Sequence, residues 1–390
     1  MMNERDMMEA YLDNSATTCV SPAVKDIVVK VMTEDYGNPS SRHQKGIDAE
    51  RYVRQARERI AATMKVDERE IYFTSGGTES NNWALIGGAM ANRRAGNHII
   101  TTAVEHAAVL QPLAMLADLG FEITHLPVDE YGHVSAEDLK QALRPETILV
   151  STMYVNNEIG AVEPVEEMGK VIKAYNPDIL YHVDAIQAYG KYRIFPAKLN
   201  IDMLSVSGHK IHGPKGSGFL YIRDRAKVKP LIFGGGQQRG MRSGTENVPG
   251  AAGLGVAAME AYTDFEEKTA RMRSCRERLI AGLNRIEGTK VISPADGAPQ
   301  IVSCSFEGVR AEVLLHALEE RQIYVSSGSA CTANRKVPVS TVLQEIHLKK
   351  DLQDTVLRFS FSDWTTEQEI DYALDVLREL LPVLRRYMRR

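Results

Sequence analysis

Short apolar runs alternate with longer helical stretches along the first two thirds of the chain, and this alternation constrains the fold more than any other feature. Four runs have the length and composition of buried strands; they span residues 70–74, 98–102, 147–151 and 181–184. The stretches with helical length span residues 48–64, 78–90, 107–119 and 165–175. Strand followed by helix favours parallel pairing, so the pattern predicts a mostly parallel sheet with helices on both faces.

The pattern changes after about residue 251. The elements expected there are a long helical region through residue 286, strands at 301–306 and 356–361, and helices at 311–320 and 366–386. These elements predict a smaller α/β domain. We expect residues 15–260 to form the large domain, and residues 1–14 and 261–390 to form the small one. No Pro-rich or Ser-rich linker separates the two, so we expect them to pack firmly together.

Composition excludes several classes of protein. The chain has 390 residues and a formal net charge of -4, which gives no electrostatic reason to expect nucleic acid or an anionic membrane as a partner. No stretch approaches the ~18 consecutive apolar residues of a membrane span. Residues 1–6 include acidic side chains and precede no apolar run, so we expect no secretory signal and a cytoplasmic location.

The four cysteines are widely scattered and form no Cys-x-x-Cys pair. This arrangement fits neither a disulfide framework nor a zinc site, and we expect no bound metal. Unpaired cysteines are usually small buried hydrophobic residues. We expect that role for Cys19, Cys275 and Cys304.

Polar residues gather where the predicted strands end. They occupy positions 74–78, 105–106, 156–157, 184 and 207–210. In parallel α/β sheets ligands bind at the carboxyl ends of strands, so these positions predict one shared site. The Gly-rich segment 75–80 lies between a strand and a helix, where it suits either a phosphate cradle or a plain turn.

Lys210, preceded by Asp184 and Gln187, suggests a pyridoxal phosphate enzyme. A lysine amine can hold an aldehyde cofactor as a Schiff base, while a carboxylate pairs with the protonated pyridine nitrogen. Plainer interpretations exist for each residue. Asp184 could cap a helix, Gln187 could be an exposed polar residue, and His106 could be a surface or core histidine. Their joint occurrence favours the cofactor site.

Several segments together resemble the cysteine desulfurases of the NifS/IscS type, and the resemblance covers nearly the whole chain. These segments are residues 11–18, 36–41, 74–82, 104–106, 156–160, 182–187, 207–216 and 242–245. Those enzymes belong to the class V aminotransferase group within pyridoxal phosphate fold type I. The resemblance implies a large domain with a mostly parallel sheet of the seven-stranded type, a smaller α/β domain, and a homodimer with pyridoxal phosphate near the subunit interface.

The resemblance also implies roles at the cofactor. Lys210 would be the Schiff-base lysine, Asp184 the partner of the pyridine nitrogen, and Gln187 the donor to the ring hydroxyl. His106 would stack on the ring and transfer protons. The remaining cofactor-binding residues would be Gly77, Thr78, Ser207, His209 and, reaching the phosphate of the neighbouring subunit, Thr245.

Asn157 and Arg358 match positions that hold the substrate in this family. An arginine suits a carboxylate because its planar guanidinium can bind both oxygens. Cys331 then decides the reaction. Its surroundings, residues 326–332, are rich in small residues, which predicts a loop that can carry a thiolate to the substrate and away again. An ordinary loop cysteine is the plainer interpretation of Cys331.

The family motif implies that the Cys331 thiolate attacks the sulfur of L-cysteine, with His106 helping to form the thiolate. The products would be L-alanine and a protein persulfide, which supplies sulfur to an acceptor such as an iron–sulfur cluster scaffold. Residues 333–340 are more basic than the matching family segment, so the sequence does not identify the sulfur acceptor.

Two alternatives stay open at this point. One is another class V enzyme, a selenocysteine lyase or an aminotransferase, in which Cys331 is incidental. The other is a catalytically silent protein that binds pyridoxal phosphate, although no helix-turn-helix or basic domain is appended to support a regulatory role. Product identity separates the first alternative from desulfuration, because formation of alanine without a keto acid favours the desulfurase.

Overall fold

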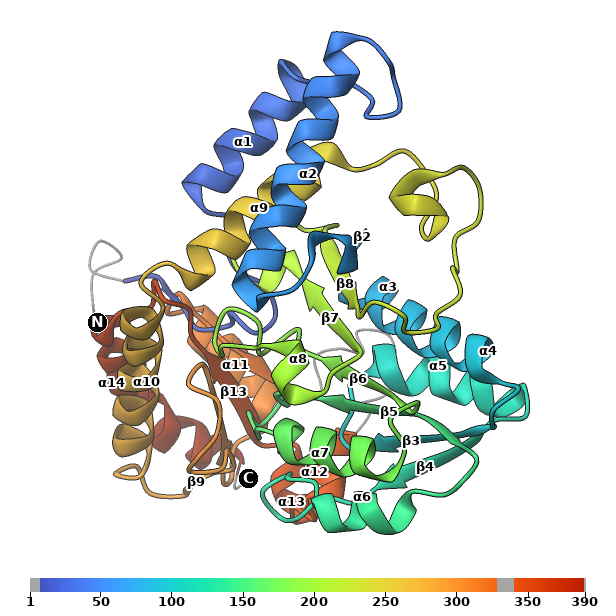
Figure 1. The fold of residues 1–390 in the computed structure, drawn as a ribbon. Helices are drawn as coiled ribbons and strands as arrows, with labels where there is room; N and C mark the ends of the chain where they lie inside the picture. Colours follow the sequence, from blue (N-terminus) through green and yellow to red (C-terminus); the bar gives the residue numbers. More distant parts are fainter. Residues whose placement is uncertain (1–7, 328–339, 389–390) are drawn as a thin grey trace.

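A seven-stranded sheet forms the centre of the large unit in the structure, a computed structural model that describes residues 8–327 and 340–388 (Figure 1). The strands are β2 (Ile71–Thr74), β3 (His98–Thr102), β4 (Glu122–Leu126), β5 (Thr147–Met153), β6 (Leu180–Asp184), β7 (Met203–Ser207) and β8 (Gly218–Ile222). Their order is β2-β8-β7-β6-β5-β3-β4; β8 is antiparallel to both neighbours, and the other pairs are parallel. The predicted mostly parallel, seven-stranded sheet is confirmed.

Alternate side chains of these strands enter two hydrophobic clusters, one on each face of the sheet. Tyr181 and Val183 of β6 belong to one cluster, and Leu180 belongs to the other. On β8, Phe219 and Leu220 divide in the same way. Successive side chains of a strand point to opposite faces, so a strand that is apolar at every position needs cover on both.

Helices provide that cover. Those on the Tyr181 face are α1 (Pro22–Thr33), α2 (Gln44–Met64), α6 (Ala136–Ala142), α7 (Val165–Tyr175) and α9 (Val248–Tyr262), with the short α8 (Pro196–Leu199) beside α7. The Leu180 face carries α5 (Ala107–Asp118) and a helical run of α3 (Gly77–Asn82), the π-turn η3 (Trp83–Gly87) and α4 (Gly88–Asn92). In α7 the buried residues Val165, Met168 and Ile172 recur at helical spacing, which forms one apolar stripe.

A second, smaller sheet forms the small unit, drawn in orange and red in Figure 1. Its order is β12-β13-β10-β9, from β9 (Thr289–Val291), β10 (Ile301–Phe306), β12 (Ser326–Ser327) and β13 (Val356–Ser360), all antiparallel. Its helices are α10 (Phe265–Leu283), α11 (Ala311–Glu319), α12 (Thr341–Glu345), α13 (Lys350–Gln353) and α14 (Glu367–Met388). The strand β1 (Ala10–Tyr11) pairs with β11 (Ile323–Tyr324), which attaches the N-terminal segment to this unit.

Two local predictions are wrong. The long helical region expected through residue 286 is broken after α9, because Asp264 has a φ of 50° and therefore cannot continue a right-handed helix. Cys19 is exposed, since its carbonyl oxygen contacts His212 at the surface while its thiol contacts only the carbonyl oxygen of the adjacent Val20. Cys275 and Cys304 are buried as predicted. Within the described ranges, no helix is both long and apolar enough to cross a bilayer.

Candidate active site

A cavity of about 510 Å³ lies at the carboxyl ends of β5, β6 and β7, between the large and small units. Ten of the residues predicted for the site line it: Gly77, Thr78, His106, Asn157, Asp184, Gln187, Ser207, His209, Lys210 and Arg358. Polar residues that follow successive parallel strands meet at one edge of the sheet, which explains how such distant positions come together.

Asp184 ends β6 and is buried beside the cavity. Its carboxylate accepts hydrogen bonds from the Ile186 backbone N–H at 3.0 Å and from the Asn81 side-chain amide at 2.7 Å. Burial raises the pKa of Asp184, and the two hydrogen bonds together with the neighbouring His106 and Lys210 act in the opposite direction. A buried carboxylate of this kind is stabilised by a cation placed in the cavity. Asn81 was given no role from the sequence, although it lies within segment 74–82.

The turn between β2 and α3 forms a cradle at the same edge. Gly76 has a φ of 148°, a conformation that L side chains rarely adopt. A Cβ added to Gly218 of β8 would lie 2.7 Å from the Gly76 Cα, so the backbone of the turn packs directly on β8. The hydroxyls of Thr78 and Ser207 line the cavity here. The turn therefore brings backbone and hydroxyl groups together where an anion can be bound.

Lys210 ends the short 3-10 helix η4 (Gly208–Lys210) directly after β7. Its amine donates to the carbonyl oxygens of Ser15 and Ala16, the second at 2.7 Å. The Lys191 amine donates to the Lys210 carbonyl at 2.5 Å, and burial lowers the pKa of Lys191 to about 8. The Lys210 segment is thus fixed both by the N-terminal segment and by Lys191.

His106 caps the N-terminus of α5, where its Nδ1 accepts a hydrogen bond from the Ala108 N–H at 3.0 Å. Because Nδ1 is an acceptor, the proton of the neutral ring lies on Nε2. The preceding Glu105 is buried, and its carboxylate accepts from the Thr102 hydroxyl at 2.8 Å and the Met153 N–H at 2.7 Å. Burial raises the pKa of Glu105 well above its usual range. Glu105 therefore fixes the connection between β3 and α5, which carries His106. The apolar residues around Glu105 in the sequence do not indicate this role.

His209 and Gln187 complete the large-unit lining. The Nδ1 of His209 lies 3.3 Å from the Thr17 hydroxyl, and burial, together with the nearby lysines, lowers the pKa of His209 to about 4. This ring is therefore neutral near pH 7. The Gln187 amide donates to the Ser15 carbonyl at 3.0 Å.

Arg358, on β13, lines the cavity from the small unit. Its Nη2 donates to the Asp13 carboxylate and its Nη1 to the Asn157 carbonyl, both at 2.9 Å. Its Nε is buried and makes no hydrogen bond with any described residue. Asp13 was missed as the partner of Arg358, and its place in segment 11–18 was the available signal. The guanidinium is therefore held in one orientation beside the cavity.

Two predicted residues remain, Thr245 and Cys331. Thr245 is exposed, in the segment that follows the short helix η5 (Gln237–Gly240). Cys331 lies outside the described residues. Ser327, shortly before it, lines the cavity, and Ser340, shortly after it, donates to the carboxylate of Glu158, which also lines the cavity. Both flanks of the segment that contains Cys331 therefore adjoin the site.

The residues present fit pyridoxal phosphate by the chemistry of their donors and acceptors. The buried Asp184 carboxylate suits a protonated ring nitrogen, the glycine turn and hydroxyls suit a phosphate, and the Lys210 amine lies at the same cavity. Among the described residues, no group of three or more His, Cys, Asp or Glu side chains is arranged to hold a metal ion.

Known proteins are similar to this chain over almost its full length. Residues 10–373 match the aminotransferase class-V family. The cysteine desulfurase IscS of Methanosarcina thermophila is 45% identical over 376 residues, which cover 96% of this chain and 92% of that protein. Among solved structures, a NifS-like protein has a TM-score of 0.91 and 39% identity, covering 97% of this chain and 100% of its own. SspA in complex with cysteine has a TM-score of 0.80 and 35% identity, covering 92% and 100%.

Proposed function

The chain belongs to the aminotransferase class-V family and is a cysteine desulfurase, and we propose how its own residues divide the reaction. It depends on pyridoxal phosphate, takes L-cysteine as substrate and transfers the sulfur to an acceptor. The observation that carries the assignment of roles is the shared cavity, where Lys210 and Asp184 of the large unit meet Arg358 of the small unit.

Residues of the large unit would hold the cofactor. When bound, pyridoxal phosphate supplies a protonated ring that takes up the electron pair released at the substrate Cα. Asp184 would face the ring nitrogen, Gln187 the ring hydroxyl, and His106 the plane of the ring. The phosphate would be bound by Gly77, Thr78, Ser207 and His209. Burial of Asp184 suits this role, because a charge at low dielectric acts more strongly on an adjacent cation than it would in water.

Arg358 would bind the carboxylate of L-cysteine, with Asn157 beside it. The hydrogen bonds of Arg358 to Asp13 and Asn157 fix its plane before substrate arrives, and its buried Nε–H has no partner among the described residues. Such preorganisation reduces the entropy lost on binding. Lys210 would move the α-proton, and His106 would exchange a proton through Nε2.

Cys331 would be the nucleophile. Its thiolate would attack the substrate sulfur, so that an S–S bond forms while the C–S bond breaks and the persulfide stays on the protein. The remaining carbon skeleton leaves as L-alanine once it has been protonated. The position of Ser327 and Ser340 beside the cavity supports this role, because Cys331 lies in the segment between them.

We further propose a homodimer in which Thr245 of one subunit completes the phosphate site of the other. Support comes from the exposure of Thr245 and from Phe233, a nearby large apolar side chain that is 79% exposed.

We also propose that the protein is cytoplasmic and that an iron–sulfur cluster scaffold is one of its sulfur acceptors. We divide the chain into domains at 15–260 and at 1–14 with 261–390, which the separate hydrophobic clusters of the two units support.

A single-turnover reaction with L-cysteine tests these roles. Cys331→Ala should abolish both L-alanine formation and the protein persulfide, whereas Cys19→Ala, which removes the exposed cysteine, should leave both unchanged. Mass spectrometry locates the persulfide, and chromatography measures the alanine. A persulfide on any cysteine other than Cys331, or alanine formation by Cys331→Ala at the normal rate, would remove Cys331 from the mechanism.

A further inference from the structure

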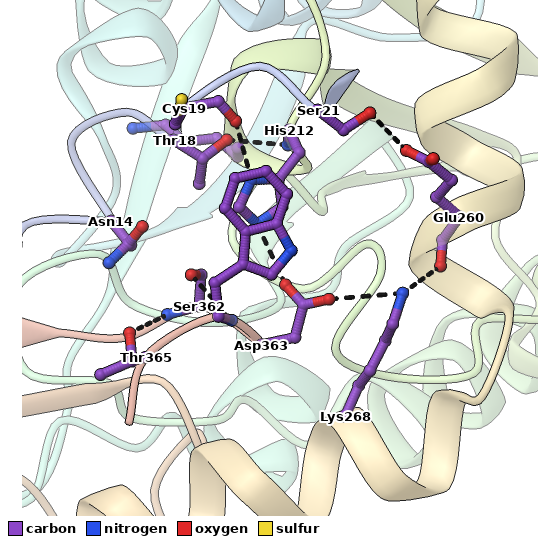
Figure 2. A network of polar contacts seen from close by, with 12 residues as sticks. Asn14, Thr18, Cys19, Ser21, His212, Glu260, Lys268, Ser362, Asp363 and Thr365 are labelled. Atoms are coloured by element: carbon purple, nitrogen blue, oxygen red, sulfur yellow. Dashed lines mark hydrogen bonds and ion pairs between the residues drawn. The ribbon is translucent and has the colours of Figure 1, made fainter. Parts of the chain in front are cut away.

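His212 follows Lys210 by two residues and makes hydrogen bonds through both ring nitrogens (Figure 2). Its Nδ1 lies 2.7 Å from the carbonyl oxygen of Cys19, and its Nε2 lies 3.0 Å from the Oδ1 of Asp363. Its backbone is held as well, because its N–H donates to the Thr18 hydroxyl at 2.7 Å and its φ is 61°. The ring therefore has one defined orientation between the N-terminal segment and the small unit.

These partners determine the protonation state of the ring. A carbonyl oxygen only accepts, so Nδ1 must carry a proton to bond Cys19. An ionised carboxylate also only accepts, so Nε2 must carry a proton to bond Asp363. Burial opposes the charge of Asp363, but the hydrogen bond from His212 and the charges of His212 and Lys268 outweigh it and lower the pKa of Asp363 to about 2. With Asp363 ionised, both contacts are made together by the imidazolium.

Further contacts extend the pair into a network that crosses the boundary between units. The Lys268 amine of α10 lies 3.3 Å from the Oδ2 of Asp363 and donates to the Glu260 carbonyl at 2.6 Å. Figure 2 shows this chain of contacts running on to Ser21, whose hydroxyl donates to the Glu260 carboxylate at 2.6 Å. On the other side, the Trp364 ring stacks on the His212 ring with centroids 4.1 Å apart. A cation stacked on an indole face is itself favourable.

The network joins the two segments that carry the reaction's main groups. His212 is two residues beyond Lys210 in the large unit, and Asp363 is five residues beyond Arg358 in the small unit. We propose that His212 and Asp363 form an ionic clasp that positions Arg358 and the Lys210 amine relative to each other, and that the clasp is complete when the imidazole is protonated. This inference rests on the proposed roles of Lys210 and Arg358. His212 is a positioning residue here, since it does not line the cavity that holds Lys210, Asp184 and Arg358.

The surroundings set the direction of the pH effect. Charged groups that line the adjoining cavity of about 360 Å³ beside His212 are Lys191, Lys210, Glu260, Lys268, Arg271 and Asp363. The Nδ1 and Nε2 of His212 bond no member of this set except Asp363. Loss of the imidazolium proton removes one of the two N–H donors, so one of the two contacts is broken in the neutral ring.

The first test compares kcat and KM for L-cysteine in the wild type and His212→Gln between about pH 6 and 9. At the acidic end, His212→Gln should lower kcat/KM roughly 3- to 30-fold, mainly through KM, because a charge-assisted contact is lost. At the alkaline end the two proteins should converge. His316→Gln, which removes an exposed histidine paired with Glu319, is the matched control and should follow the wild type.

The second test follows the protonation of the His212 ring through the fluorescence of Trp364. The chain has two tryptophans, and the other, Trp83, is buried in the core. An imidazolium in contact with an indole quenches its emission, so Trp364 fluorescence of the holoenzyme should rise as His212 loses its proton. The titration should disappear in His212→Gln and in Trp364→Phe. If His212→Gln does not fold, Asp363→Asn replaces it in the kinetic test, since that change also removes the ionic partner, and Trp364→Phe alone serves as the control for the emission.

Three results would overturn the clasp: a constant ratio of kcat/KM between wild type and variant across the pH range, a Trp364 emission that does not titrate, or a titrating emission without any change in KM. Failure of the proposed residue roles has a different signature, because Lys210→Ala would then retain turnover while the Trp364 titration stayed intact.

Discussion

The two ends of segment 207–212 lie in surroundings that are assembled in different ways. Ser207, His209 and Lys210 face a cavity whose other polar groups follow strands of one parallel sheet. His212 faces a network assembled from the N-terminal segment, α10 and the loop after β13. The first arrangement follows from strand order and places the reacting groups. The second depends on how the small unit packs, and it determines where Arg358 lies relative to Lys210.

The comparison predicts that changes on the cavity side abolish the reaction, whereas changes on the clasp side alter its pH dependence and the stability of the fold. The largest effect should come from Lys210→Ala, because the amine is the proposed proton carrier at the substrate Cα. Formation of L-alanine should fall by at least about 10³-fold. Single-turnover assays measure this rate.

Lys215→Ala is the control for Lys210→Ala, since Lys215 is an exposed lysine five residues further along the same segment. It should leave alanine formation within about twofold of the wild type. Comparable losses of alanine formation in the two variants would mean that the loss comes from disturbance of the segment and not from removal of the Lys210 amine.

Arg358→Lys should have the next largest effect. Lysine keeps the positive charge but cannot reproduce the contacts to Asp13 and Asn157 while it also binds a carboxylate. KM for L-cysteine should rise roughly 10- to 100-fold, with a smaller change in kcat. Arg321→Lys, at a surface pair with Glu379, is the matched change and should leave KM alone. An unchanged KM in Arg358→Lys would place the substrate carboxylate elsewhere.

Gly218→Ala tests whether the close packing of the Gly76 turn on β8 supports the proposed phosphate cradle. The added Cβ would lie 2.6 Å from the Val206 carbonyl oxygen and 2.7 Å from the Gly76 Cα, and backbone atoms cannot yield as side chains do. We expect about 3 kcal/mol loss in the free energy of unfolding, with weaker binding of pyridoxal phosphate. Urea unfolding and a cofactor titration measure the two effects. Gly236→Ala, where a Cβ meets no atom within 4 Å, should change neither.

The sequence predicted the cavity side better than the clasp side, for physical reasons. Strands such as 98–102 and 147–153 are buried on both faces, so their composition alone marks them. The polar residues that follow these strands are placed by the order of the strands in the sheet. Arg358 entered only through resemblance to a family, and the same resemblance decided between the nucleophile and an ordinary loop cysteine for Cys331, because an isolated arginine or cysteine has no local pattern that fixes its role.

Partners that come from distant segments could not be predicted in this way. Asn81 beside Asp184, Asp13 beside Arg358, and Asp363 beside His212 are each separated from their partner by more than 100 residues. Such pairs depend on tertiary packing, which neither periodicity nor motif spacing encodes. The break at Asp264 was missed for a related reason, since one residue with positive φ interrupts a stretch whose composition stays helical throughout.

Asp363→Asn should have the smallest effect, and it tests the clasp through acid stability. The pKa of Asp363 in the folded protein is about 2 and its ordinary value is 3.8, so the folded state binds the proton less tightly. The ionised carboxylate therefore stabilises the fold above about pH 4, and this contribution is lost as the pH falls toward 2. Asp363→Asn should lower the free energy of unfolding by about 1–2 kcal/mol at neutral pH, and the difference from the wild type should shrink below pH 4. Urea unfolding at several pH values measures this, with Asp375→Asn, at an exposed pair with Arg378, as a control that should cost less than about 0.5 kcal/mol. A difference that persists unchanged in acid would mean that Asp363 contributes through packing, and the ionic account of the clasp would then be wrong.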